Sequence, residues 1–270
     1  MSCRISLEEV VLMTVILCLA RGQPQIAQPM VERLLVRQPN NLIALTAHAR
    51  LQFARRSHEA ALQTYQKMLG LSPDMSPDPR IGLGLCAWVI GDRDTARRAW
   101  ERSLQRVSHR SHHGALELIT QDPASWTSLL LLGLAALNRA REPSASREER
   151  LEFETEGVAF VQRAFKLNNK SAASALALAT ITGQGGNLPV ASKLAERAIQ
   201  YADNKRHSAL ANAERGRLGF VSGDVGDAGP FIAAAKTEEG NGVNMLAELT
   251  LGQIAIKNGT YRRPSPASNV

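Results

Sequence analysis

The stretch Gly82–Ala87, GLGLCA, has the residue types and spacing of a phosphate-binding loop. In the G-x-G-x-x-A fingerprint, glycines let the backbone approach a dinucleotide. The motif also requires a preceding strand and an acidic residue about 20 positions further on. Residues 72–79 in front of it read SPDMSPDP, and three prolines there are typical of a turn or linker. The sequence therefore predicts that these glycines serve packing, with no nucleotide cofactor.

A second candidate is the group His109, His112 and His113, because histidines in one loop could ligate a metal. No cysteine or carboxylate stands at zinc-ligand spacing beside them, so we expect an exposed polar loop and no metal site. Nucleophile-elbow, Walker and H-E-x-x-H motifs are absent from the sequence. Two carboxylate pairs, at residues 148–149 and at 154 and 156, are expected to be solvated. The sequence predicts no catalytic residue, no cofactor, no small-molecule substrate and no enzyme.

The composition favours helices over strands. Hydrophobic residues make up 44% of the 270 residues and aromatic residues only 4%, while alanine, leucine, arginine and glutamate are abundant. The formal net charge of +7 fits an acidic protein partner or nucleic acid without choosing between them. The basic residues come as scattered pairs and the aromatics fall at core spacing, so direct nucleic-acid binding is not expected. Three cysteines without metal-ligand spacing are typical of a reducing compartment.

Residues 10–20, VVLMTVILCLA, are apolar enough to be compared with a signal peptide. Glu8 and Glu9 stand where such a peptide needs positive charge. The stretch is also shorter than the roughly 20 apolar residues needed to cross a bilayer. We therefore expect neither secretion nor membrane insertion.

Small residues recur along the chain with a period near 34. Ala27, Ala61 and Ala96 are spaced by 34 and 35 residues, and later intervals are 34 and 37 residues. Helices approach to about 8–10 Å only where the crossing point lacks bulk, so these positions predict paired helices. The predicted crossing residues are Ala49, Gly84, Gly133, Ala179, Gly216 and Gly252 in first helices, and Ala27, Ala61, Ala96, Gly157, Ala191 and Ala228 in second helices.

This unit resembles the tetratricopeptide repeat, with its pattern W-x-x-L-G-x-x-Y…A-x-x-x-F…P. The segment from Arg80 to Trp100 matches the pattern except at its first and last positions. The resemblance implies an all-α fold, a tetratricopeptide-repeat α-solenoid in which helix–turn–helix hairpins form a right-handed superhelix. Glycine suits the left-handed conformation after a helix end, so four glycines are expected to end first helices: Gly91, Gly186, Gly223 and Gly259.

The solenoid is predicted to span residues 1–262, with about six repeats and a terminal half repeat. Insertions are expected near residues 108–123 and 140–150, and residues 263–270 are expected to form a disordered tail. A half repeat leaves an apolar face uncovered, which solenoids normally avoid. This pattern predicts that the chain is a fragment or that its end is misassigned.

Protein partners are expected in the groove of the solenoid, because first helices line the concave side of stacked hairpins. The helical period, projected outward from the crossing residues, selects the side chains of this groove. An apolar groove rimmed by arginine suits an amphipathic or acidic segment. For Phe53 and Trp88 a place in the interior is an equal alternative. The candidate partner-binding residues are Arg50, Phe53, Leu85, Trp88, Leu134 and Asn138.

Several segments follow one another in an order found in a known scaffold. A proline-containing joint precedes RIGLGLC at residues 80–86, and LLGLAALNRA, GVAFVQRAFKLNN and LAELTLGQIAIKNGTY come later. Residues 24–261 thereby resemble the scaffold subunit of the RNA polymerase-associated factor (Paf) complex. That family's scaffold is several times longer, so the partners of its other parts are not implied for this chain.

The Paf resemblance implies a non-enzymatic scaffold in the nucleus. Its implied partners are the other Paf complex subunits and the RNA polymerase II machinery. Its implied role is to hold those subunits on elongating polymerase and to promote co-transcriptional histone ubiquitination and methylation.

Two other classes of function stay open. One is the substrate- or partner-binding arm of a larger assembly, such as a ubiquitin ligase or a glycosyltransferase, with catalysis elsewhere. The other is an RNA-binding or RNA-decay scaffold, which only the basic charge favours. RNA binding through phosphates should weaken steeply with added salt, so the salt dependence of binding distinguishes the RNA-binding hypothesis from the others.

Overall fold

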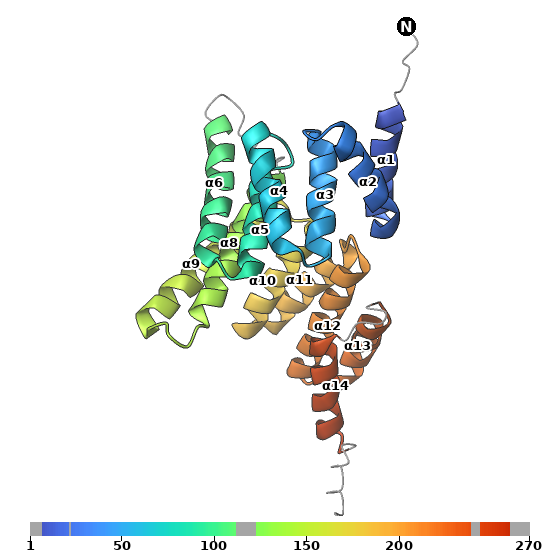
Figure 1. Ribbon diagram of the computed structural model, residues 1–270. Coiled ribbons are helices and arrows are strands. Elements are labelled where there is room, and N and C mark those ends of the chain that lie inside the picture. Colours follow the sequence, from blue (N-terminus) through green and yellow to red (C-terminus); the bar gives the residue numbers. More distant parts are fainter. Residues whose placement is uncertain (1–6, 22, 112–122, 239–243, 260–270) are drawn as a thin grey trace, which may run out of the picture. The chain divides into compact units, whose positions relative to one another are not determined.

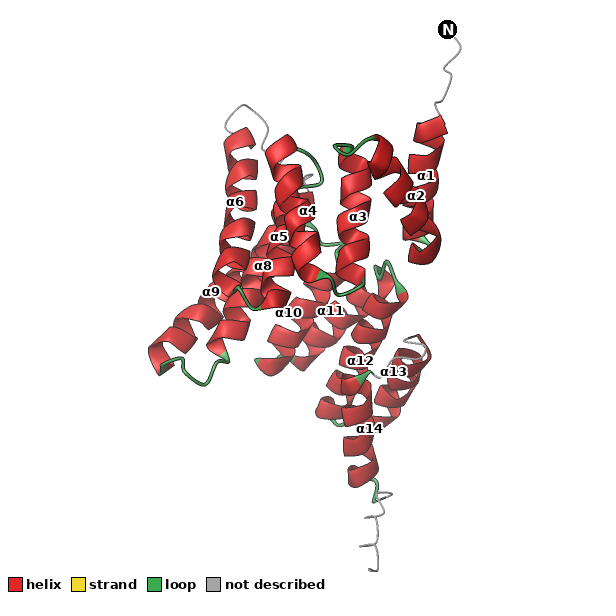
Figure 2. Ribbon diagram, viewed as in Figure 1, coloured by secondary structure: helices red, strands yellow, loops and turns green. Residues whose placement is uncertain are grey.

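The computed structural model of the chain describes residues 7–21, 23–111, 123–238 and 244–259. These residues form thirteen helices and no strand, so the all-α prediction is confirmed (Figures 1 and 2). The chain divides into two compact units, Met1–Leu132 and Gly133–Val270. A single solenoid over residues 1–262 stays a prediction, and the predicted tail 263–270 lies outside the described residues.

The first unit is built from three helical hairpins. They pair α1 (Leu7–Ala20) with α2 (Pro24–Arg37), α3 (Leu42–Ala54) with α4 (His58–Leu71), and α5 (Pro79–Ile90) with α6 (Arg93–Ser111). Neighbouring hairpins pack through α2 with α3 and α4 with α5. Of the insertion predicted at 108–123, residues 108–111 continue α6 and residues 112–122 lie outside the described part of the chain.

The second unit continues the hairpin pattern. α8 (Pro123–Ala140) crosses the boundary between the units and is followed by α9 (Arg147–Leu167). Next come the pairs α10 (Ala172–Gln184) with α11 (Leu188–Gln200) and α12 (Lys205–Ser222) with α13 (Val225–Glu238). α14 (Met245–Lys257) packs on α12 and α13. Within the insertion predicted at 140–150, residues 141–146 form a turn and α9 begins at Arg147.

Helix starts carry the side chains that satisfy free backbone amides. Asn41 Oδ1 accepts hydrogen bonds from the backbone N–H groups of Ile43 and Ala44, both at 3.1 Å. At the start of α9, Ser146 and Glu149 form a reciprocal capping box. Such caps stabilise a helix end by about 0.5–2 kcal/mol. Short polar residues therefore fix where several of these helices begin, α3 and α9 among them.

The predicted turn glycines adopt the left-handed conformation. Gly91, Gly186, Gly223 and Gly259 have φ values of 103°, 84°, 93° and 67°. This confirms the prediction that they follow helix ends. The turn between α3 and α4 differs, because Arg56 adopts a φ of 63° there without the freedom of a glycine.

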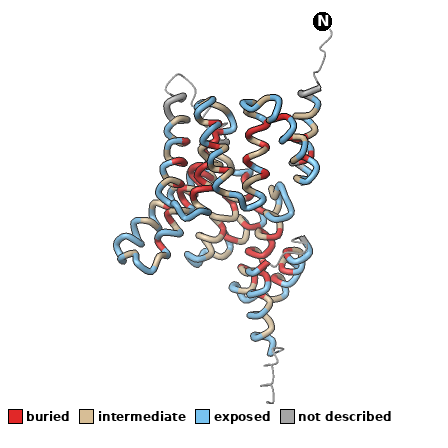
Figure 3. Tube along the Cα trace, in the orientation of Figure 1, coloured by how far each residue is buried: buried red, intermediate tan, exposed pale blue. Residues whose placement is uncertain are grey.

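The predicted crossing residues occupy the helix interfaces, with one exception. Ala49, Ala179 and all five second-helix alanines are 0% exposed, and Gly84, Gly133, Gly157 and Gly216 are also buried (Figure 3). A side chain on Gly133 would come within 2.8 Å of Val161 in α9. Gly252 is exposed instead, and a side chain placed on it would meet no atom within 4 Å. Its predicted packing role is therefore wrong for the described residues.

A buried carboxylate ties the joint before α5 to α6. Asp78 is 4% exposed and accepts hydrogen bonds from the Arg80 backbone N–H at 3.0 Å and from Ser103 Oγ at 2.8 Å. Its carboxylate also forms ion pairs with Arg80 Nη1 and Arg106 Nε, each at 3.2 Å. These bonds compensate for the burial of the charge. Arg106 also donates hydrogen bonds to the backbone carbonyl oxygens of Asp74 and Met75, which fixes the joint next to α6.

The apolar stretch 10–20 lies in α1. Its residues Val15 and Cys18 are buried in a cluster with residues of α2 and α3. In the part of the chain that the structure describes, no helix combines the length and apolar character needed to span a bilayer. Packing within the first unit thus accounts for Val15 and Cys18, whereas Met13, Ile16 and Leu17 of the stretch are exposed.

Candidate partner-binding site

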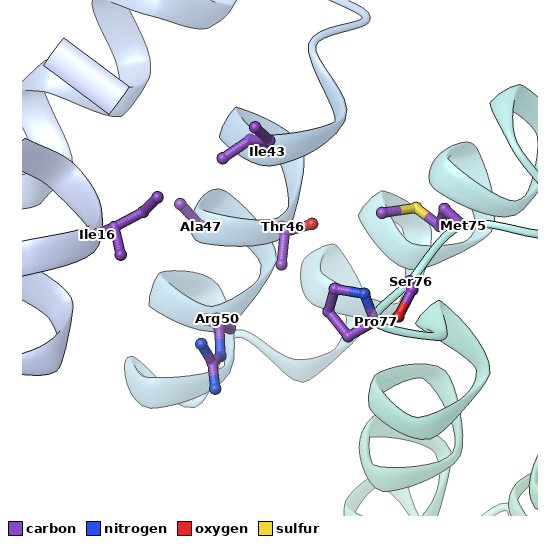
Figure 4. Close-up of a pocket in the computed structure, with 8 residues that line it drawn as sticks. All are labelled: Ile16, Ile43, Thr46, Ala47, Arg50, Met75, Ser76 and Pro77. Carbon is purple, nitrogen blue, oxygen red and sulfur yellow. The ribbon is translucent and has the colours of Figure 1, made fainter. Parts of the chain in front are cut away.

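A groove of about 600 Å³ runs along one face of α3 in the first unit. Ile43, Thr46, Ala47 and Arg50 form its floor, and their spacing of three, four and seven residues puts them on one helix face. Ile16 of α1 lies on one side of this floor, and the joint residues Met75, Ser76 and Pro77 lie on the other (Figure 4). We call this the α3 groove.

The α3 groove combines exposed apolar side chains with one cation. Ile16 and Ile43 are each 51% exposed, and Arg50 is also exposed. The Arg50 guanidinium forms no ion pair and no hydrogen bond with any described residue. An apolar side chain beside a carboxylate is the ligand chemistry that such a groove accommodates best.

Of the six predicted site residues, Arg50 lines the α3 groove. Phe53, on the same helix, is half-buried and packs against the core, with its ring centroid 4.9 Å from that of His58. Leu85 and Trp88 on α5 are also half-buried. The Trp88 ring lies 6.0 Å from that of Trp100 and 5.4 Å from the Arg93 guanidinium carbon. Binding by these residues stays a prediction.

The other two predicted site residues belong to the second unit. Leu134 is 43% exposed and Asn138 is exposed, both on α8. Their spacing of four residues puts them on one side of that helix. They are available to a ligand of the second unit, and that role stays a prediction.

Sequence reasoning missed most of the residues that line the α3 groove. Ile43, Thr46 and Ala47 could have been found, because they share a helix face with Arg50. Met75, Ser76 and Pro77 could not, because their place depends on how the proline-rich joint folds around Asp78. The α1 residue Ile16 could not be found either, since its position depends on the packing of α1 on α3.

A second, smaller pocket of about 380 Å³ is strongly basic. Arg80, Arg98 and Arg102 line it, together with Gln66 and Thr95 from α4 and α6. Arg80 is already paired with Asp78, whereas Arg98 and Arg102 are exposed. This pocket adds positive charge to the first unit, which again favours an acidic ligand.

Two ionisable side chains of the core of the first unit are Tyr65 and Cys86. Burial raises the pKa of Tyr65 to about 12 and that of the Cys86 thiol to about 11, so both stay protonated near neutral pH. No group of three His, Cys, Asp or Glu side chains among the described residues could hold a metal. Of the histidines weighed as ligands, His112 and His113 lie outside the described residues, and the side chain of His109 is not described.

The sequence of the chain is similar to a repeat family model and to two longer proteins. Residues 12–76, from within α1 to the end of α4 and the joint after it, match a tetratricopeptide repeat family model. The chain is 25% identical over 221 residues to RNA polymerase-associated protein CTR9 of Saccharomyces cerevisiae, covering 81% of this chain and 19% of that protein. It is 27% identical over 251 residues to Protein CTR9 homolog of Arabidopsis thaliana, covering 91% and 20%.

Among solved structures, the chain is similar to PilW, a type IV pilus biogenesis factor. The TM-score is 0.61 over 92% of this chain and 99% of PilW, at 11% sequence identity. This likeness shows the fold alone. The chain spans about a fifth of the length of the curated relatives that it matches.

The fold is therefore a tetratricopeptide-type α-solenoid, as predicted. Solenoids of this type present extended surfaces to other proteins and are typically non-catalytic scaffolds. The chain is accordingly a tetratricopeptide-type interaction scaffold.

Proposed function

We propose that the chain acts in the nucleus as a scaffold segment of a Paf complex subunit. The observation that carries this proposal is its similarity to two proteins named CTR9, which extends over 81% and 91% of the chain. One of them is named as RNA polymerase-associated. In this role the repeats hold other Paf complex subunits near elongating RNA polymerase II and thereby promote co-transcriptional histone modification.

The α3 groove is the proposed partner-binding surface of the first unit. Its apolar side chains Ile16 and Ile43 receive an apolar residue of the partner, and Arg50 pairs with an acidic residue beside it. Phe53, Leu85 and Trp88 belong to the same group of first helices, and Leu134 and Asn138 contribute in the second unit. Non-catalytic binding of an acidic, amphipathic segment follows from these side chains.

Affinity purification of the tagged chain from nuclear extract, with mass spectrometry of the bound proteins, tests the proposal. We expect recovery of the other Paf complex subunits and of RNA polymerase II. Arg50→Glu and Ile43→Glu should each reduce that recovery at least about tenfold, because each loses a charge pair or an apolar contact in the groove.

Two variants control for charge and polarity changes at exposed positions. Arg37→Glu makes the same change on α2, and Val36→Glu puts a carboxylate at a residue that is 85% exposed. Both should bind like the unmodified chain. Recovery of chaperones alone would contradict the proposed function. Equal recovery with the groove variants and the control variants would contradict binding in the α3 groove.

A further inference from the structure

The smaller pocket of the first unit, which we call the basic pocket, lies between α4, α5 and α6 and has a volume of about 380 Å³. Arg80 of α5 lines it together with Arg98 and Arg102 of α6, and Gln66 of α4 adds an amide. Arg98 and Arg102 are four residues apart, so they lie on one side of α6. Side chains from three helices therefore line one pocket, and no carboxylate is among its described lining residues.

The arginines of α6 differ in whether the chain gives them a carboxylate. Arg97 pairs with Glu101 at 2.8 Å, and Arg106 pairs with Asp78 at 3.2 Å. Arg102, which lies between them along the helix, forms no ion pair and no hydrogen bond with any residue that the structure describes. Its guanidinium, with five N–H donors, is therefore available to a ligand.

The other two guanidiniums are partly held in place. Arg98 Nε donates a hydrogen bond to the Asp94 carbonyl oxygen at 3.2 Å, and its two Nη groups have no partner among the described residues. Arg80 Nη1 donates a hydrogen bond to the Pro73 carbonyl oxygen at 2.9 Å and pairs with Asp78 at 3.2 Å. These bonds restrain both side chains before a ligand binds, which lowers the entropy that binding costs.

The number of guanidiniums indicates which anion fits. One guanidinium can bind a carboxylate through two parallel hydrogen bonds. A phosphate monoester carries a charge of about −1.5 to −2 at pH 7 and three acceptor oxygens, so it can use two or three guanidiniums at once. Arg98 and Arg102 also repel each other at their spacing of four residues, and a dianion between them removes that repulsion. The basic pocket thus suits a phosphate better than a carboxylate.

The rest of the lining distinguishes a phosphorylated protein from nucleic acid. Leu83 and Ala99 are buried and Leu69 is half-buried, and all three contribute apolar atoms to the pocket. Proteins bind single strands of nucleic acid with aromatic side chains along a track of basic residues. No aromatic residue is among the described residues that line this pocket. One phosphate beside an apolar side chain is therefore the ligand that the lining fits.

We propose that the basic pocket binds the phosphate of a phosphorylated serine or threonine in a partner protein. Arg98 and Arg102 donate charge-assisted hydrogen bonds to the phosphate oxygens, Arg80 is the third cation, and the apolar lining receives a neighbouring apolar residue of the partner. α5 packs on both α4 and α6, so the pocket is open although its flanking helices are in place. The site is separate from the α3 groove and does not depend on the function proposed above.

A pool of short fluorescein-labelled peptides, with one fixed phosphoserine and randomised flanking residues, serves as the probe. Titration with the full chain, followed by fluorescence anisotropy, should show saturable binding. Two matched pools carry serine or glutamate in place of the phosphoserine, and both should bind at least about tenfold more weakly. The glutamate pool tests the need for a dianion, because its side chain carries a single negative charge.

Variants of the chain locate the bound probe. Arg98→Gln combined with Arg102→Gln should raise the apparent Kd of the phosphoserine pool at least about tenfold, because two charge-assisted contacts are lost. Arg33→Gln combined with Arg37→Gln is the matched control, since these arginines are also exposed and four residues apart, on α2. The control should leave the Kd unchanged. All four positions are exposed, and circular dichroism should show the same helicity in every variant.

Three results would overturn the proposal. The first is that the phosphoserine pool binds no more tightly than the glutamate pool, since the pocket then does not select a phosphate. The second is an equal Kd in the pocket variant and the control variant, since the probe then binds elsewhere. The third is that inorganic phosphate, or an oligouridylate of about 12 nucleotides, binds more tightly than the phosphoserine pool and loses its affinity in the pocket variant. The pocket then serves a free anion or RNA.

Discussion

The indole of Trp100 lies where a side chain on Gly84 would have to be placed. A Cβ atom built on Gly84 would come within 2.6 Å of the indole Cε2, and Trp100 is only 2% exposed. The indole Nε1 donates a hydrogen bond to the Ile81 carbonyl oxygen at 3.4 Å. The crossing of α5 and α6 is therefore set by one residue without a side chain and one with the largest.

Gly84→Ala should lower the free energy of unfolding by about 1–3 kcal/mol, because the added methyl group overpacks the crossing. Urea denaturation measures this change. Gly70→Ala is the matched control, since Gly70 lies in α4 with no atom within 4 Å of the new methyl group. That control should gain up to about 1 kcal/mol from helix propensity. Equal effects at the two positions would contradict the packing role of Gly84.

Arg56→Gly should stabilise the turn between α3 and α4 by up to about 1 kcal/mol. Arg56 has a φ of 63°, a left-handed conformation that costs a residue with a side chain roughly 1–2 kcal/mol and glycine very little. The greater freedom of glycine in the unfolded chain offsets part of the gain. The melting temperature should rise, whereas Arg55→Gly, next to it but without a positive φ, should lower it or leave it unchanged.

Asp78→Ala should cost about 3–5 kcal/mol, because it leaves the largely buried guanidinium of Arg106 without its carboxylate. Ser103→Ala removes only one hydrogen bond to Asp78 and should cost about 1 kcal/mol. Guanidinium denaturation of both variants provides the comparison. Similar losses in the two would mean that the ion pairs of Asp78 contribute little.

Stability should fall as the pH falls below about 6.5 because of His48. Burial lowers the pKa of His48 below its ordinary value of 6.5, against the opposing influence of Glu32. The unfolded chain therefore binds a proton at a higher pH than the folded chain does. The contribution of neutral His48 is fully present above pH 6.5 and is lost as the pH drops towards the folded-state pKa.

His48→Gln should flatten this pH dependence, because the glutamine does not titrate. Denaturation midpoints measured from pH 7.5 down to pH 5 compare the two chains. A parallel decline in both would assign the acid sensitivity to other groups.

The hairpins could be predicted from the sequence because their determinants are local. Small residues spaced by 34 to 37 positions mark helix crossings in consecutive repeats, and a glycine such as Gly91 marks a left-handed turn. The positive φ of Arg56 could not be predicted in this way, because nothing in its residue type indicates a positive φ. The exposure of Gly252 could not be predicted either, since its spacing does not reveal whether a second helix covers it.

The candidate site was less predictable because it depends on contacts between distant residues. The position of Met75–Pro77 follows from Asp78, which bonds to Ser103, 25 residues further along the chain. Projection of the helical period selected Trp88 but did not decide whether its side chain lies in the groove or in the interior. In the structure Trp88 is half-buried and its ring lies 6.0 Å from that of Trp100, and its role in partner binding stays a prediction.

Within each unit, helices pack mainly on helices that are their neighbours in the chain. Relative contact order is therefore low, and only short loops have to close before native contacts form. Each unit should fold within microseconds to milliseconds, like other proteins of low contact order. Folding is free to nucleate at any hairpin and to spread to the next, as in other linear arrays of repeats.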